Sequence, residues 1–319
     1  MRPPRWITVS ACAVLVGAAL TVSVGCGEDA GVTGSVRVGG SSTLLSFVQE
    51  AAAEFSVDHP LARTDVAMTG TGDGIALLCD AISGVAAASR PATVSERRDC
   101  VRSGVPAVPL LVGRDAVVVF TARDSRAPTC LDLSTLAAVT GPQGRGVRTW
   151  SAAGLPLVPL AVVVPESGSG TRDTFVEKVI APAAALSGGA SGIRSDAVAR
   201  PLNQLMLAAV LGTPGAIGIA GLQTADPWRD RVRLIAIDGG DGCIIPSEAS
   251  VSNGNYPLSR DLFLYISGDA EGSHGEATIA FGDLVSSPGF LERVGQGLSA
   301  ADIAATTRSW AGRRTGDTP

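Results

Sequence analysis

Short apolar runs alternate with segments of helical spacing along most of the 319-residue chain. The runs are rich in valine, isoleucine, leucine and alanine and are bounded by glycine, proline and serine, which is typical of buried strands. Strands interleaved with helices in this way indicate a parallel-rich α/β fold, and the length favours two domains. Strands are expected at residues 35–40, 64–70, 84–89, 108–113, 115–121, 155–164, 215–221, 232–238 and 261–267. Helical segments are expected at residues 44–57, 74–82, 171–180 and after residue 276, and the alternation continues through residues 131–139 and 197–211.

Four loops follow predicted strands, and three of them lead into predicted helices. In α/β sheets, ligands bind beyond the carboxyl ends of the strands, where such loops lie. All four are rich in glycine, serine and threonine, and two carry an arginine, Arg90 or Arg172. Backbone N–H groups, hydroxyls and guanidinium groups at helix N-termini bind small anions, so the four loops together predict an anion site. They are loop 1, GGSSTLL (39–45); loop 2, TGTGDGI (69–75); loop 3, ASRPAT (88–93); and loop 4, SGSGTRD (167–173).

Loop 4 has a second interpretation when it is taken alone. The stretch ESGSGTRDTF (166–175) separates a strand-like run from a helix-like run. A plain strand-to-helix turn would use glycine for its backbone angles and Thr171 as the N-cap of the helix. The repetition of the same composition in the other three loops favours the anion site.

The charge distribution argues against nucleic acid as a partner. The formal net charge is −5, and the 25 basic residues, of which Lys178 is the single lysine, are scattered without runs. Binding to a phosphate backbone requires a basic patch or stripe. An acidic protein that binds an anion must therefore do so through local groups.

The N-terminal segment is typical of an export signal. A short basic start is followed by an uncharged stretch and then by Gly25 and Cys26, which resembles a bacterial lipobox, although Ser23 stands where leucine is usual. We expect a signal peptide at residues 1–25, a lipid on Cys26 and a tether at residues 26–34. Cleavage without lipidation and an uncleaved membrane anchor remain alternatives. The tail at residues 313–319 is expected to be disordered.

Four cysteines remain after the signal and Cys26: Cys79, Cys100, Cys130 and Cys243. An even number in an exported chain, without a C-x-x-C pair, favours two disulfides over a metal site or free thiols. Three pairings are possible. We favour Cys79 with Cys100, which closes a short loop, and Cys130 with Cys243.

The order of these motifs resembles that of the phosphate-binding lipoproteins of bacterial phosphate ABC transporters. The resemblance rests on the four loops together with DAVVV, GAIG and NGNYPLSRDLFLYI, and runs from about residue 35 to about residue 294. It implies a two-lobed type II periplasmic-binding-protein fold, with a desolvated phosphate in the cleft between the lobes. Lobe one would comprise residues 35–118 and 238–312, and lobe two residues 119–237. Residues 115–121 and 232–238 would be the strands that cross between them.

The resemblance also implies a ligand set drawn from both lobes. Loop 1 would bind the anion at a helix N-terminus, loop 3 would add a hydroxyl and a positive charge, and loop 4 would close from the other lobe with N–H groups, hydroxyls and a second guanidinium. The expected ligands are Ser42, Thr43, Leu44, Ser89, Arg90, Ser169, Gly170, Thr171 and Arg172.

The chain departs from the family pattern at two places. Some family members have an aspartate after the serine of loop 3, as acceptor for the phosphate proton, where this chain has Arg90. Some have an arginine before loop 4, where this chain offers Pro165 or Glu166. We expect Arg172 to compensate for the missing arginine and Asp73 of loop 2 to be the acceptor. Asp73 as an ordinary turn or N-cap residue is the alternative.

Enzymatic function has little support in the sequence. The two histidines, His59 and His274, belong to no evident triad or zinc-site spacing, and no G-x-S-x-G or G-x-x-x-x-G-K-[ST] motif is present. We therefore expect a monomeric binding protein without catalytic residues, metal or cofactor, anchored by lipid to the outer face of the cell membrane. Its partners would be inorganic phosphate and an ABC permease. The alternative is a surface lipoprotein of the same fold that acts as a sensor or adhesin with altered or lost oxyanion binding.

Overall fold

The computed structural model describes residues 31–155, 157–167, 169–268 and 275–313. By its internal contacts the chain divides into Met1–Gly31 and Val32–Pro319, and all the elements below belong to the second unit. The expected signal segment, Cys26, His274 and the end of the expected tail lie outside the described residues. Across the described ranges, none of the helices combines the length and the apolar character required to cross a bilayer.

A nine-stranded sheet is the main feature of the described residues. Its successive strands are β2 (Ala62–Ala67), β1 (Gly34–Gly40), β3 (Val85–Ala88), β12 (Ser259–Ser267), β4 (Ala107–Ala122), β8 (Ala216–Gly221), β6 (Ala161–Pro165) and β7 (Val198–Arg200). The ninth, β9 (Val232–Leu234), pairs with β4. A three-stranded sheet has the order β11 (Cys243–Ile244), β10 (Ala236–Asp238) and β5 (Cys130–Asp132).

The buried apolar residues fall into two lobes, as the resemblance implies. The core of the first lobe contains buried residues from Val36 to Val112 and again from Leu264 to Trp310. The core of the second lobe contains buried residues from Ala116 to Leu258. The second lobe is thus inserted into the first, and the chain passes between them on β4 and β12.

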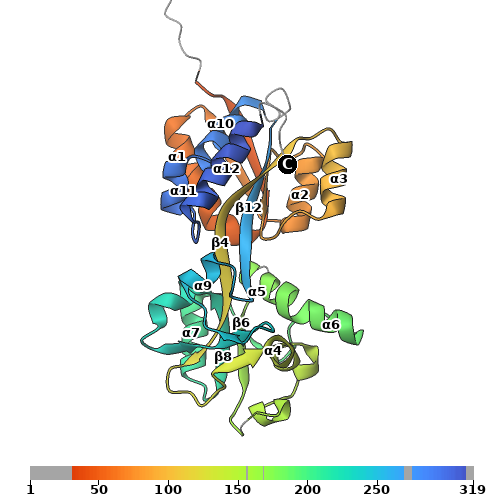
Figure 1. Cartoon of the computed structure of the whole chain (residues 1–319), viewed down its shortest axis with the longest axis vertical. Coiled ribbons are helices and arrows are strands. Elements are labelled where there is room, and N and C mark those ends of the chain that lie inside the picture. Colours follow the sequence, from red (N-terminus) through yellow and green to blue (C-terminus); the bar gives the residue numbers. More distant parts are fainter. Residues whose placement is uncertain (1–30, 156, 168, 269–274, 314–319) are drawn as a thin grey trace, which may run out of the picture. The chain divides into compact units, whose positions relative to one another are not determined.

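β4 and β12 pair antiparallel over most of their length, and Figure 1 shows both running from one lobe to the other. The structure differs here from the sequence expectation, which placed the return crossing at residues 232–238. Those residues form β9 and β10 inside the second lobe, and Tyr256 and Leu258 still belong to its core. The Tyr256 hydroxyl donates to the carbonyl of Val117 at 3.2 Å, which fixes the segment before β12 to the second lobe.

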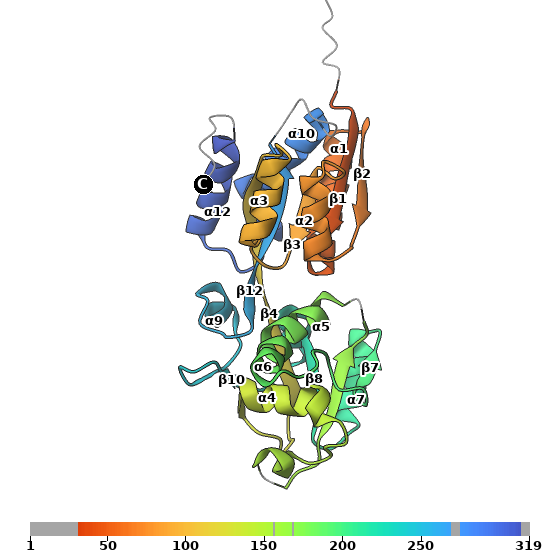
Figure 2. The ribbon, with the colours of Figure 1, turned by 90° about the vertical axis from the view of Figure 1, so that its right-hand side faces the viewer.

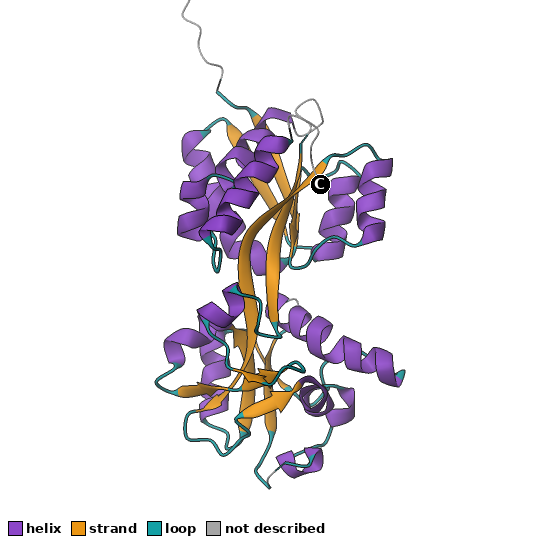
Figure 3. Ribbon diagram, viewed as in Figure 1, coloured by secondary structure: helices purple, strands orange, loops and turns teal. Residues whose placement is uncertain are grey.

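Helices flank the strands in both lobes (Figure 3). In the first lobe they are α1 (Leu45–Asp58), α2 (Thr71–Cys79), α3 (Val94–Arg102), α10 (Gly275–Val285), α11 (Pro288–Val294) and α12 (Ala300–Gly312). In the second lobe they are α4 (Leu133–Thr140), α5 (Gly170–Phe175), α6 (Ala181–Ser187), α7 (Asn203–Leu211), α8 (Leu222–Ala225) and α9 (Glu248–Ser252). A 3₁₀ turn, Ser42–Leu44, precedes α1, and a π-helical segment, Val176–Ile180, joins α5 to α6. Figure 2 shows α2 and α3 side by side in the first lobe and α5 leading into α6 in the second.

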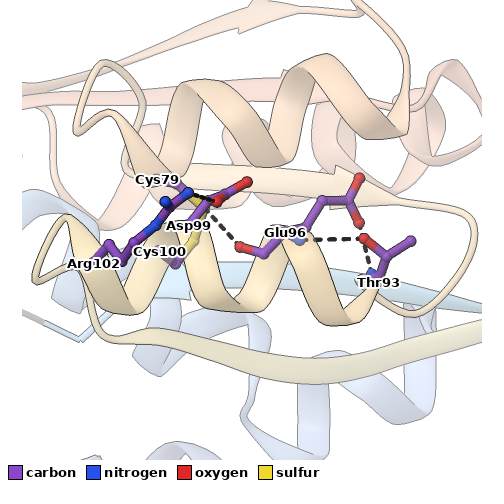
Figure 4. The surroundings of a disulfide bond; sticks show 6 residues. All are labelled: Cys79, Thr93, Glu96, Asp99, Cys100 and Arg102. Atoms are coloured by element: carbon purple, nitrogen blue, oxygen red, sulfur yellow. Dashed lines mark hydrogen bonds and ion pairs between the residues drawn. A yellow bond between two sulfur atoms is a disulfide. The ribbon is translucent and has the colours of Figure 1, made fainter.

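Both favoured disulfides are present in the structure. Cys79–Cys100 joins the C-terminal parts of α2 and α3, and Cys130–Cys243 joins β5 to β11 in the second lobe. Figure 4 shows the first of them, with the Asp99–Arg102 ion pair at the end of α3. In the chain-entropy model, a cross-link over a sequence separation of 21 residues stabilises by about 3 kcal/mol.

Candidate functional site

Three of the four predicted loops meet at one edge of the first lobe. β1 pairs in parallel with β2 on one side and with β3 on the other, so the carboxyl ends of the three strands are adjacent. Loops 1, 2 and 3 follow these strands directly. Loop 4 follows β6 in the second lobe and leads into α5. The topology therefore brings loops 1 to 3 together at one edge of the first lobe.

A cavity of about 350 Å³ lies where all four loops come together. Its lining is mostly backbone and hydroxyl groups, with one guanidinium and two carboxylate side chains. The lining residues are Ser41 and Ser42 of loop 1, Met68, residues 69–72 of loop 2, Ser89 and Arg90 of loop 3, and Gly170, Asp173, Thr174 and Glu177 of loop 4 and the helix after it. We call it the four-loop cavity.

A larger cavity of about 770 Å³ adjoins it. Ser42 and Gly170 line both cavities. The larger cavity also receives residues of loops 1 and 4 that the sequence analysis predicted as ligands: Thr43, Leu44, Ser169 and Thr171. The predicted set is thus divided between two neighbouring cavities that meet at Ser42 and Gly170.

Loop 1 requires glycine because its backbone lies very close to β3 and α2. Gly40 has φ +129°, and a Cβ there would lie 2.1 Å from the carbonyl oxygen of Ala87. A Cβ on Gly74, in the first turns of α2, would lie 2.5 Å from the Cα of Gly40. The Ser41 N–H donates to the same Ala87 carbonyl at 2.8 Å. Only glycine at these positions lets loop 1 pack directly on β3 and α2.

Loops 2 and 3 are joined by hydroxyl groups. The Ser89 N–H donates to Thr71 Oγ1 at 3.1 Å, and the two hydroxyl oxygens lie 3.2 Å apart. This bond fixes Ser89 beside the start of α2. The two hydroxyl groups can still turn towards an anion, since each can donate one hydrogen bond and accept another.

Arg90 is the cation that lines the four-loop cavity, and it is paired with Glu96 of α3. Arg90 Nη1 and Nη2 each donate to a carboxylate oxygen of Glu96 at 2.9 Å, and Nη1 also donates to the Pro91 carbonyl at 3.1 Å. Hydrogen bonding to Arg90 lowers the pKa of Glu96 to about 2, and the same bond raises the pKa of Arg90. Glu96 also accepts from the Thr93 N–H at 2.7 Å and completes the capping box that begins α3 (Figure 4).

Loop 4 touches loop 1 through Gly170. A Cβ on Gly170 would lie 2.2 Å from Thr43 Oγ1, 2.8 Å from the Thr43 nitrogen and 3.0 Å from Ser42 Oγ. The Thr43 hydroxyl is buried and has no hydrogen-bond partner among the described residues. Buried polar groups are normally paired, so this hydroxyl is available to a ligand that enters between the loops.

Two predicted ligands do not reach either cavity. Asp73 is an exposed residue in the first turn of α2 and lines neither. The Arg172 guanidinium donates to the Pro165 carbonyl at 3.0 Å, at the end of β6, and also lines neither cavity. Asp173, which was expected to point away from the cleft, is also exposed, but it lines the four-loop cavity.

Arg260 was not among the predicted ligands, although it lies in the motif NGNYPLSRDLFLYI. The Arg260 side chain is 2% exposed. Its Nη1 donates to the Gly170 carbonyl at 3.1 Å, and its Nη2 to Asp115 Oδ2 at 2.9 Å. An arginine shortly before the apolar part of a strand was the available signal, because a buried charge in such a position needs a partner.

Comparison with known proteins identifies the class. The chain matches the family model described as PBP superfamily domain over residues 27–288 and belongs to that family. The family is one of binding proteins, so the chain is a binding protein and not an enzyme. The two-lobed α/β fold is that of the type II periplasmic phosphate-binding proteins, which confirms the predicted fold class.

The particular relatives are bacterial proteins, and two of the three described below are named for phosphate binding. The chain is 28% identical over 240 residues to protein SphX of Synechococcus elongatus, covering 74% of this chain and 68% of that protein. It is 25% identical over 261 residues to the phosphate-binding protein PstS of Staphylococcus epidermidis, covering 81% and 76%. The crystal structure of a possible phosphate binding protein from Planctomyces limnophilus matches with a TM-score of 0.77 and 25% identity, covering 88% of this chain and 99% of that one.

Proposed function

We propose that this protein binds inorganic phosphate between its lobes and delivers it to an ABC permease in the membrane. The observation that carries the proposal is the four-loop cavity. Hydroxyl side chains from three loops line it together with the Arg90 guanidinium: Ser41, Ser42, Thr69, Thr71 and Ser89. Hydroxyls and a guanidinium are the donors that a tetrahedral oxyanion requires. The relative PstS is named a phosphate-binding protein, which supports the same ligand.

The proposed ligands come from both lobes. Loops 1 and 3 would bind the anion through Ser42, Thr43, Leu44, Ser89 and Arg90, and loop 4 through Ser169, Gly170 and Thr171. Because Gly170 already contacts loop 1, entry of the anion requires the loops to separate, and the ligand set is complete only after they close again. Closure of two lobes around a ligand is a common hinge motion.

The energies are sufficient for tight binding. A micromolar dissociation constant corresponds to about −8 kcal/mol. Hydrogen bonds to a charged group contribute about 1.5 to 3 kcal/mol each, so a few of them exceed this figure before the costs of closure. Part of the Arg90 contribution is offset, because Arg90 must give up or share its bonds to Glu96.

Export and anchoring complete the proposal. Two disulfides within the described residues indicate an oxidising compartment outside the cytoplasm. We propose that residues 1–25 direct export and that lipid on Cys26 anchors a monomeric protein to the outer face of the cell membrane. The tether at residues 26–34 would then keep the lobes close to the permease.

Calorimetric titration of the mature chain with phosphate, arsenate and sulfate tests the function. We expect micromolar or tighter binding of phosphate and more than tenfold weaker binding after Arg90→Ala. Arg98→Ala is a matched control, because it removes one positive charge from the exposed surface of α3, outside both cavities. No heat with phosphate for the wild type would reject the proposal and leave a sensor or adhesin of the same fold.

A further inference from the structure

The segments that connect the two lobes carry charged residues in register. Arg260 of β12 is paired with Asp115 of β4, and Asp261 with Arg114, at adjacent positions of the antiparallel ladder. These positions lie between the two cores, which end at Val112 and begin at Ala116 on β4. A register shift follows at Leu262 and Phe263, which marks a bulge at the boundary with the first lobe.

One of these ion pairs is bound to the first lobe. Arg114 Nε donates to Asp261 at 2.9 Å, and its two terminal nitrogens donate to Asp302 at 2.7 and 3.1 Å. Asp302 is part of the capping box that begins α12. Arg114 therefore attaches one face of the two-stranded ribbon that β4 and β12 form between the lobes, the connecting ribbon, to a helix of the first lobe.

The other ion pair is bound to loop 4. Successive residues of a strand point to opposite faces, so Asp115 and Arg260 lie on the face opposite to Arg114 and Asp261. Arg260 bonds to Asp115 and to the carbonyl of Gly170. The Asp115 side chain is 17% exposed and lines the larger cavity beside Gly170. Arg260 therefore attaches this face of the ribbon to the residue that touches both cavities and Thr43.

We infer that Arg260 is a positioning residue of the anion site, which fixes the Gly170 peptide to the connecting strands and so directs the backbone N–H groups of loop 4. For phosphate affinity this inference rests on the function proposed above. Arg260 does not act as a free positive charge, because Asp115 neutralises it. It acts through geometry, since a guanidinium can donate to a carboxylate and to a carbonyl at fixed angles at the same time. The compact ammonium of lysine lacks this planar arrangement.

A role in stability alone accounts poorly for this arrangement. Buried ion pairs contribute little net stability relative to apolar residues of similar size. Arg260 Nε is also buried without a partner among the described residues, which adds a desolvation cost. Both observations are expected if the Arg260–Asp115 pair serves to position Gly170 and not to stabilise the fold.

The test compares Arg260→Lys with Arg194→Lys. Arg194 is a matched control because its side chain is also buried, 3% exposed. It likewise donates to backbone carbonyls, those of Val139 and Val147, and to the carboxylate of Asp196. None of these partners belongs to loop 4 or to the connecting strands. Amide hydrogen exchange is measured on the ligand-free proteins, and phosphate affinity is measured by calorimetry.

In Arg260→Lys we expect exchange over residues 170–175 to be at least tenfold faster, with exchange in the core strands unchanged, and phosphate affinity to fall at least tenfold. In Arg194→Lys both properties stay within twofold of the wild type. If Arg260→Lys does not fold, Asp115→Asn replaces it, with exchange over residues 170–175 expected to rise about threefold. Unchanged exchange in loop 4 for the variant that folds would overturn the inference. Failure of the wild type to bind phosphate would reject the proposed function, while the exchange measurement would still decide the role of Arg260.

Discussion

Arg90 and Glu96 are joined by two parallel hydrogen bonds of 2.9 Å, one to each carboxylate oxygen. The only guanidinium that lines the four-loop cavity within the described residues is thus already bound to a carboxylate. An anion in the cavity must compete with Glu96 for the same donors and is repelled by its charge. Glu96 is therefore expected to lower the affinity of the site.

Replacing Glu96 by glutamine is expected to strengthen phosphate binding by about threefold to tenfold, which corresponds to about 1 kcal/mol. Glutamine retains the acceptor for the Thr93 N–H and is equally suited to a capping box, so α3 keeps its start. Calorimetry of the variant and the wild type measures the change. Weaker binding would show instead that Glu96 holds Arg90 in its binding position.

The Arg90–Glu96 pair also predicts how stability depends on pH. The pKa of Glu96 is lowered from 4.5 to about 2, so its contribution is fully present above pH 4.5 and is lost as the pH falls towards 2. Because both side chains are partly exposed, we expect about 1 kcal/mol. Urea unfolding between pH 6 and 2.5 should show the wild type losing this advantage over Glu96→Gln, and parallel curves would contradict it.

Asp173 is expected to distinguish phosphate from sulfate. Near neutral pH, phosphate carries a proton that it can donate and sulfate carries none, so a carboxylate that only accepts favours phosphate. Asp173 lines the four-loop cavity, whereas Asp73 does not. We expect Asp173→Asn to lose at least tenfold in phosphate affinity and to gain measurable sulfate binding.

Asp73→Asn is the matched control for Asp173→Asn and should leave both titrations as in the wild type. The opposite pattern, with the loss confined to Asp73→Asn, would restore the assignment made from the sequence and require α2 to move on binding.

Gly170→Ala tests the contact between loops 1 and 4. The added Cβ would lie 2.2 Å from Thr43 Oγ1 and 2.8 Å from the Thr43 nitrogen, so the loops must separate. We expect phosphate affinity to fall more than tenfold with little change in the midpoint of unfolding. Gly221→Ala, whose Cβ would have its nearest neighbour at 3.8 Å in the larger cavity, should bind normally. Normal binding by Gly170→Ala would show that the contact is absent from the bound form.

Local sequence was sufficient to place the loops but not the groups that depend on distant pairing. Loops 1 to 4 were recognisable because glycine, serine and threonine at the ends of apolar runs report on the backbone within a few residues. Arg260 was not, because its partner Asp115 is 145 positions away and only the pairing of β4 with β12 brings them together. The return crossing was predicted at residues 232–238 and not at β12 for the same reason. The sequence offered several strands that could have crossed back to the first lobe.

The sequence pattern also could not predict in which direction a side chain points in the first turn of a helix. Asp73 and Asp173 both lie in the first turn of a helix after a glycine-rich loop. Successive residues of a helix are about 100° apart around its axis. A difference of one position therefore decides whether an aspartate in such a turn faces the cavity. The packing of each helix on its sheet sets its rotation about that axis, and the motif itself does not contain it.

The insertion of the second lobe into the first has a consequence for the order of folding. The sheet of the first lobe places β12 between β3 and β4, so its N-terminal strands cannot complete their pairing until the segment after residue 258 is available. The second lobe is contiguous and has its whole core within residues 116 to 258. In a chain that is synthesised from its N-terminus, the second lobe can therefore fold before the first lobe, whose sheet is complete only when β12 is available.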